Sequence, residues 1–224
     1  MFCNRAFDHP EFVDGFEYYA RTVLVHYADR VGTWYTFNEP TLEANLMRHW
    51  TYSRNVLMAH ARVVRWYRSE IRGSGKWSMK LDLTNTGFAL PLDPSNQSDI
   101  GAAVRRNKFS FGYFANPLFR AEQVPEAMIE ALGDKVPQYT QQELEFINGT
   151  ADFLAFDIYT ATYHSAPAGG YKQCVENKEH AEWPACTSRS RTRGTWESNF
   201  QGHVDRPAVS PIPIQIFAFP GSLT

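Results

Sequence analysis

One acidic residue follows directly on a short aromatic and β-branched run, a position suited to acid–base chemistry. Residues 33–37 (Thr-Trp-Tyr-Thr-Phe) predict a buried strand, which ends at Asn38, Glu39 and Pro40, three residues of low strand propensity. A carboxylate beside a buried strand lies in low-dielectric surroundings, which raise its pKa toward the value that a general acid needs near neutrality. The competing interpretation is an ordinary surface glutamate in a turn. Glu39 is therefore the first candidate catalytic residue.

Polar groups also stand at the end of a second predicted strand. Residues 152–159 are apolar nearly throughout, which is typical of a strand buried on both faces, and Asp157 and Tyr159 lie at its end. Residues 76–84 alternate between apolar and polar side chains and predict a third strand. Because the carboxyl ends of parallel strands share one face, we expect Asp157 and Tyr159 in the same cleft as Glu39.

The segments around these strands predict helices. Apolar residues recur there at three- and four-residue steps, the period of an amphipathic helix. Asp8 with Glu11, and Thr140 with Glu143, have the spacing of a helix-starting capping box. Strands separated by helices pair in parallel through right-handed crossovers. The predicted helices cover residues 11–30, 53–72, 99–114, 125–132 and 140–147.

This order of elements fits either a (β/α)8 barrel or an open doubly wound sheet, two α/β folds. Both place ligands at the carboxyl ends of parallel strands, but no glycine-rich phosphate loop follows any strand, so we prefer the barrel. The three predicted strands would form roughly the middle of a (β/α)8 TIM barrel, within residues 1–165. We expect an irregular, loop-rich insertion over 166–211, and a divergent strand with a tail over 212–224.

Two cysteines lie inside the loop-rich stretch. Cys174 and Cys186 could close this loop as a disulfide or remain free thiols, and their spacing leaves both interpretations open. We expect no metal site there, because His180 is the only nearby nitrogen ligand and no Cys-x-x-Cys spacing occurs.

The overall composition argues against several function classes. The 224 residues carry 22 basic and 24 acidic side chains, a net charge of -2 that argues against nucleic acid as the partner. No apolar run approaches about 18 residues, so we expect no membrane-spanning helix and no membrane partner. The first ten residues lack the basic start and apolar stretch of a signal peptide, so none is visible.

The strand that precedes Glu39 carries a resemblance to a known family. Residues 34–40, Trp-Tyr-Thr-Phe-Asn-Glu-Pro, resemble the W-x-T-F-N-E-P motif of glycoside hydrolase family 1, the β-glucosidase family. Other segments are similar to the family's motifs in the same order, from about residue 11 to residue 163. These segments are 12–31, 58–61, 109–117, 132–140 and 152–160.

The resemblance implies a retaining β-glycosidase that acts on a β-linked glucoside or oligosaccharide without metal or organic cofactor. Glu39 would be the general acid and then the base, and Asn38 would bind the sugar 2-hydroxyl. Tyr159 would orient the second carboxylate, and Asp157 stands where the family usually has Asn. The loop from Cys174 to Cys186 resembles that of secreted fungal members, which implies an extracellular full-length relative.

Two departures from the family bear on activity. The family's early strands, with a sugar-binding Gln and His, would precede Met1, and Ile216 stands where the nucleophilic Glu is expected. We therefore expect an internal fragment or shortened gene product without its nucleophile. The first hypothesis is a family-1 hydrolase, and the second is a non-catalytic sugar-binding or interaction remnant of that family. A third, another barrel glycosidase that shares only the Asn-Glu pair, is disfavoured by the collinear motifs.

Overall fold

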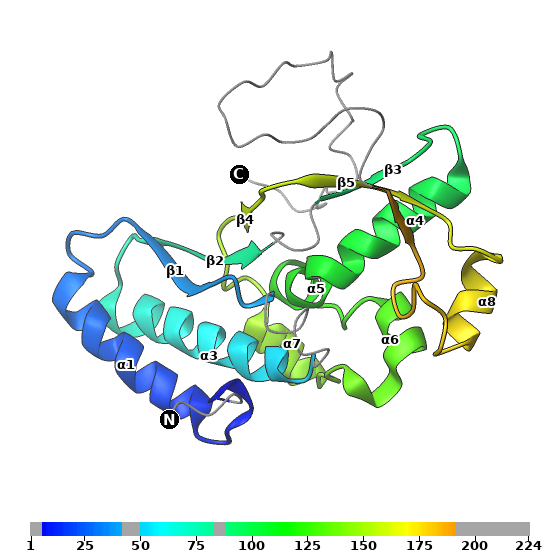
Figure 1. Ribbon diagram of the computed structural model, residues 1–224. Helices are drawn as coiled ribbons and strands as arrows, with labels where there is room; N and C mark the ends of the chain where they lie inside the picture. Colours follow the sequence, from blue (N-terminus) through cyan, green and yellow to red (C-terminus); the bar gives the residue numbers. More distant parts are fainter. Residues whose placement is uncertain (1–5, 42–49, 83–87, 191–224) are drawn as a thin grey trace, which may run out of the picture.

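The computed structural model describes residues 6–41, 50–82 and 88–190. The predicted strand over 212–219 and the Ile216 position lie outside these ranges. Helices α1, α3 and α7 lie on one side of strands β1 and β2, and α4 lies beside the second sheet (Figure 1). The helices are α1 (Phe12–Tyr27), α3 (Tyr52–Trp66), α4 (Gln97–Asn107), α5 (Tyr113–Arg120), α6 (Glu126–Leu132), α7 (Gln141–Ile147) and α8 (Gly170–Glu176).

The first sheet contains the three strands that the sequence predicts. Its strands β1 (Thr33–Asn38), β2 (Lys76–Asp82) and β4 (Ala155–Asp157) pair in the order β1-β2-β4, and both pairs are parallel. This arrangement confirms the parallel pairing that the alternation of strands and helices predicts. All three carboxyl ends therefore lie at one edge of the sheet.

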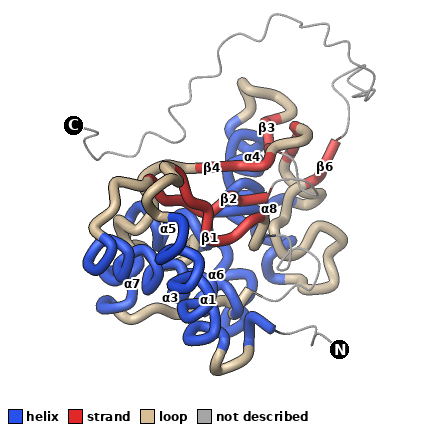
Figure 2. The backbone as a smooth tube through the Cα atoms, turned by 90° about the vertical axis from the view of Figure 1, so that its left-hand side faces the viewer, coloured by secondary structure: helices blue, strands red, loops and turns tan. Residues whose placement is uncertain are grey.

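A second sheet was not predicted. It consists of β3 (Phe88–Pro91), β5 (Ala161–Ser165) and β6 (Ser188–Ser190), with β3 and β5 parallel and β5 and β6 antiparallel. The predicted strand over 152–159 is thus shorter than expected, and a second strand follows it after three residues. The strands of both sheets are the red segments of the tube in Figure 2. The loop-rich stretch after residue 166 also contains regular structure, namely α8 and β6.

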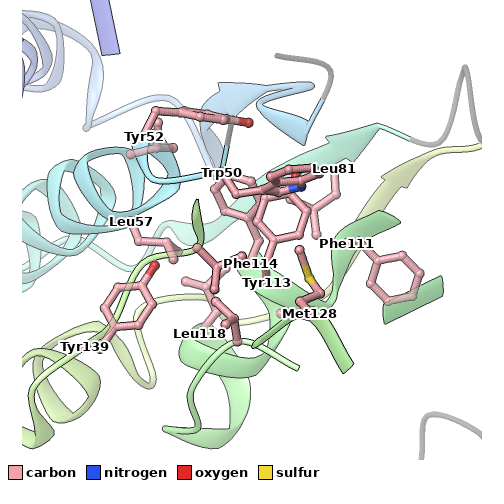
Figure 3. Packing of buried hydrophobic residues seen from close by; sticks show 14 of the residues in the cluster. Trp50, Tyr52, Leu57, Leu81, Phe111, Tyr113, Phe114, Leu118, Met128 and Tyr139 are labelled. Carbon is pink, nitrogen blue, oxygen red and sulfur yellow. The ribbon is translucent and has the colours of Figure 1, made fainter. Parts of the chain in front are cut away.

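The main hydrophobic core lies between the helices and the first sheet. Figure 3 shows its centre, where Tyr52 and Leu57 of α3 face Phe114 and Leu118 of α5, and Met128 of α6 lies beside them. Burial of several large side chains from four helices and two strands supplies the favourable free energy that holds the sheet in place.

A smaller core lies at the amino ends of β1 and β2. Trp77 is 1% exposed, its ring stacks on Trp34 with centroids 5.8 Å apart, and the Tyr67 ring meets it edge-on at 5.0 Å. Asp152 fixes the segment before β4 to the same place, since its Oδ2 accepts a hydrogen bond from the Trp77 amide at 2.7 Å. The guanidinium of Arg68 pairs with the other oxygen of Asp152 at 3.1 Å.

Of the two predicted capping boxes, one forms. The Thr140 side chain accepts from the Glu143 amide at the start of α7, and the Glu143 side chain accepts from the Thr140 amide. The predicted box of Asp8 and Glu11 is wrong. Residues Ala6–Asp8 form a 3-10 turn, so α1 begins later, with Glu11 as its N-cap and no side-chain capping bond.

Candidate active site

A β-bulge shapes the end of β1, where the candidate acid is carried. Tyr35 pairs in register with Ser78, and Asn38 pairs with Lys80. β1 therefore has one residue more than β2 between these two pairs. An extra residue of this kind bends a strand and redirects the side chains that follow it.

Two successive residues of β1, Thr36 and Phe37, consequently face the helices. The Thr36 Oγ1 lies 2.7 Å from the Nδ1 of His60 on α3, and the Phe37 ring stacks on Phe16 of α1 at 4.2 Å. In a regular strand only one of two neighbours would face that side. The next side chain, Asn38, is exposed, as the alternation of strand residues predicts for a side chain on the face away from the helices.

Glu39 follows the bulge in a strained backbone conformation. Its φ is 54°, in the left-handed region that residues other than glycine adopt rarely and at a cost. Its amide donates a hydrogen bond of 2.7 Å to the Lys80 carbonyl, and the carbonyl of the buried Pro40 accepts one from the Tyr52 hydroxyl. Neighbouring elements thus hold the turn on both sides of Glu39, whose side chain is partly buried.

An ion pair links the two neighbouring strand ends. The Nζ of Lys80 lies 3.0 Å from the Oδ2 of Asp157, and the two side chains are 34% and 21% exposed. Lys80 belongs to the central strand β2, and Asp157 is the last residue of β4. The pair therefore spans the carboxyl edge of the sheet, where sequence analysis expects the cleft.

Three of the predicted site residues act electrostatically on this lysine. The hydrogen bond to Asp157 raises the pKa of Lys80, and the charges of Asp157, Tyr159 and Glu39 act in the same direction although partial burial opposes them. Tyr159 is 56% exposed, just beyond the end of β4. Of these groups, Asp157 contacts the ammonium group directly, and Glu39 is bound through the Lys80 carbonyl.

Lys80 is the site residue that sequence reasoning missed. Within residues 76–84 the apolar face, with Trp77 and Met79, was the feature that predicted the strand. The signal lay in the other half of the alternation, since Lys80 and the buried Ser78 lie on the face of the strand opposite Trp77 and Met79. A lysine on that face of a parallel strand, near its carboxyl end, marks a position beside ligands.

The two loop cysteines are bonded in this structure. The Cα atoms of Cys174 and Cys186 lie 5.7 Å apart, within the usual range for a disulfide. Arg105 of α4 fixes the bridged loop, because its Nε donates to the Ala185 carbonyl at 2.9 Å and its Nη2 donates to the Cys186 carbonyl at 2.7 Å.

Neither a metal cluster nor a membrane-spanning helix is found among the described residues. Over 6–41, 50–82 and 88–190, no group of three or more His, Cys, Asp or Glu side chains is arranged to hold a metal ion. Within the same residues, no helix has the length and apolar character needed to cross a bilayer.

Comparison with known proteins identifies the family. The sequence model described as "Glycosyl hydrolase family 1" matches residues 4–202, most of the chain. The chain belongs to glycosyl hydrolase family 1. This family 1 chain is 31% identical over 187 residues to lactase/phlorizin hydrolase of Rattus norvegicus, an alignment that covers 71% of the chain and 10% of the relative.

Solved family 1 structures share the fold. A β-glucosidase of the fungus Humicola insolens in complex with glucose matches with a TM-score of 0.67 and 25% identity, over 82% of this chain and 42% of that one. Aphid myrosinase matches with a TM-score of 0.71 at 23% identity, over 86% of this chain and 45% of that one. The family 1 chain described here thus spans less than half the length of these relatives.

Proposed function

We propose that this site retains the acid–base half of a retaining β-glucosidase. Glu39 protonates the glycosidic oxygen as the aglycone leaves, and its carboxylate then activates the water that releases the sugar. The observation that carries the proposal is that Glu39 follows β1 and Asp157 ends β4 at one edge of the sheet, and that both contact Lys80 of the strand between them. That edge is the catalytic face of a parallel β/α barrel.

The other predicted residues have roles in sugar binding. The Asn38 side chain, exposed on the face away from the helices, hydrogen-bonds the sugar 2-hydroxyl, a contact that strengthens as positive charge develops on the ring. Asp157 accepts hydrogen bonds from sugar hydroxyl groups, and the Tyr159 hydroxyl orients a second carboxylate. The substrate class is a β-linked glucoside or oligosaccharide, which the names of the β-glucosidase relatives support.

The proposal also covers the fold that holds the site and the cellular compartment in which the protein matures. Strands β1, β2 and β4 correspond to middle strands of a (β/α)8 barrel, which is supported by their parallel order and by the fold shared with family 1 structures. The full protein matures in an oxidising, extracellular environment, since disulfides such as that of Cys174 and Cys186 persist there.

Retention requires a second carboxylate, about 5–5.5 Å from the acid and across the sugar from it. Ile216, which the sequence puts in place of the nucleophilic Glu, has a side chain that can neither attack the anomeric carbon nor stabilise a cation. We therefore expect residues 1–224 to bind sugar weakly without turning it over. A non-catalytic remnant, the second hypothesis, would behave in the same way as long as no nucleophile is supplied.

A binding experiment tests the site directly. We expect methyl β-glucoside to shift the NMR signals of Asn38, Glu39, Asp157 and Tyr159 at millimolar concentration, and methyl β-mannoside, its C2 epimer, to do so more weakly. Asn38→Ala should remove this preference, because the amide that recognises the 2-hydroxyl is gone. Shifts confined to other parts of the chain, or a preference that survives Asn38→Ala, would contradict the assignment.

A hydrolysis assay completes the test. With an aryl β-glucoside, the purified chain should release no nitrophenol above background. Turnover that disappears in Glu39→Gln would show that another carboxylate of this chain serves as nucleophile. Turnover that is unchanged in Glu39→Gln would refute the role of Glu39 itself.

A further inference from the structure

The residue that joins the two halves of the site has no role in the proposed chemistry so far. Lys80 lies on β2, between the strand that carries Glu39 and the strand that carries Asp157. Its main chain and its side chain each bind one of these residues. The Lys80 carbonyl accepts the Glu39 amide at 2.7 Å, and its Nζ lies 3.0 Å from the Asp157 carboxylate.

The acidic groups of the site outnumber the single positive charge of Lys80. Asp157, at the end of β4, contacts the ammonium group, and Glu39 follows β1 on the other side of β2. One ammonium group thus lies on the strand between those that carry two carboxylates, and the hydrogen bond to Asp157 and the charge of Glu39 both raise the pKa of Lys80. The Lys80 side chain keeps its charge wherever the carboxylates titrate, since a lysine whose pKa is raised stays protonated far above neutral pH.

We propose that Lys80 is a positioning residue of the active site, which fixes Glu39 through its carbonyl and Asp157 through its ammonium group and supplies the positive charge that both carboxylates share. The inference rests on the proposed function, because it assigns Lys80 a role in setting the charge of the acid. It explains how two carboxylates, those of Glu39 and Asp157, can both lie at one edge of the sheet. The role of neither residue in sugar hydrolysis explains this alone.

The consequence is a coupled titration. A nearby cation favours the ionised form of a carboxylic acid, and a nearby anion favours the protonated form. Without the lysine charge, Asp157 would act on Glu39 uncompensated, and the acid would hold its proton to higher pH. Without the Asp157 charge, Lys80 would act on Glu39 more strongly, and the acid would lose its proton at lower pH.

Carboxyl NMR titration of the 224-residue chain tests this. The Glu39 signal in ¹³C-labelled protein is assigned by its loss in Glu39→Gln. We expect the Glu39 titration midpoint to rise by about half to one pH unit in Lys80→Met and to stay within about 0.2 unit in Lys80→Arg. Lys76→Met is the matched control, because it removes the same charge from the exposed start of β2, about 13 Å away along the strand.

A second variant keeps the test decisive if Lys80→Met fails to fold. Asp157→Asn keeps the shape of the side chain and should lower the Glu39 midpoint, opposite in sign to the effect of Lys80→Met. A general loosening of the site would shift the Glu39 titration midpoint in the same direction in both variants. Equal midpoints in all variants, or equal shifts in Lys76→Met and Lys80→Met, would overturn the proposal.

The result is separable from the proposed function. If the midpoints move as expected but methyl β-glucoside does not bind, Lys80 sets the charge of a site that is not for sugar, so the proposed function fails while the coupling stands. If the sugar binds through Asn38 but the midpoints do not move, the sugar site stands and Lys80 is not its positioning residue.

Discussion

Lowering the pH from 7 to 4 should remove about 3 kcal/mol from the free energy of unfolding through His60 alone. His60 is completely buried, and this burial lowers its pKa to about 3, although the hydrogen bond to Thr150 opposes the shift. In the unfolded chain the side chain takes up a proton near its ordinary pKa of 6.5. The unfolded state therefore binds more protons between these values, so His60 costs no stability above pH 6.5 and progressively more as the pH falls toward 3.

The contacts of His60 fit a neutral ring. Its Nε2 lies 3.2 Å from the Thr150 carbonyl, to which it can only donate, and its Nδ1 lies 2.7 Å from the Thr36 hydroxyl, from which it then accepts. Its complete burial within α3 gives this histidine a packing role. Through its contact with the Thr36 hydroxyl, the ring also holds the bulged strand on the side that faces the helices.

Denaturant unfolding at pH 7 and pH 4 measures the effect. His60→Gln offers a neutral donor and acceptor in place of the ring, so the loss of stability between the two pH values should shrink by about 3 kcal/mol. His26→Gln, on the exposed face of α1, is the matched control and should leave the pH dependence as in the parent chain. An undiminished pH dependence in His60→Gln would show that His60 is not the responsible group.

The second large effect concerns the bridged loop. Replacing both Cys174 and Cys186 by serine should cost about 3 kcal/mol of stability, because the bridge restricts the unfolded chain over a loop of 12 residues. The comparison is between the oxidised parent chain and the double variant in denaturant. Reduction of the parent chain is the control and should reproduce the loss. Equal midpoints for the oxidised chain and the variant would indicate that the two thiols are free in solution.

Much of the fold follows from local patterns in the sequence. The alternation in residues 76–84 and the apolar run before Asn38 are local, and so is the capping box of Thr140 and Glu143, so strands and helices could be placed from them. The box of Asp8 and Glu11 failed because a 3-10 turn, a feature outside the spacing rule, precedes the helix. The continuous apolar run over 152–159 hid the short break between β4 and β5.

The site depended more on pairing between strands than on patterns within them. Glu39, Asp157 and Tyr159 could be placed at strand ends, because topology alone puts parallel carboxyl ends at one edge. The role of Lys80 could not be placed, because it depends on which strand lies in the middle and on which register brings its ammonium group to Asp157. Likewise, the spacing of the two cysteines permits a disulfide but does not establish one, since the Cα distance is set by the fold of the loop.

Because of the bulge in β1, the contacts of the side chains at this end of the strand depend on the exact number of residues in it. Between Tyr35 and Asn38 the strand takes three steps where its partner takes two. A one-codon deletion of Thr36 or Phe37 would remove the bulge and restore regular alternation, so that Asn38 would keep Lys80 as its partner while either the contact with His60 or the stacking on Phe16 would be lost. Family members that lack one residue in this strand should therefore be aligned with the gap at Thr36 or Phe37, because a gap placed elsewhere in the strand would equate side chains on opposite faces of the sheet.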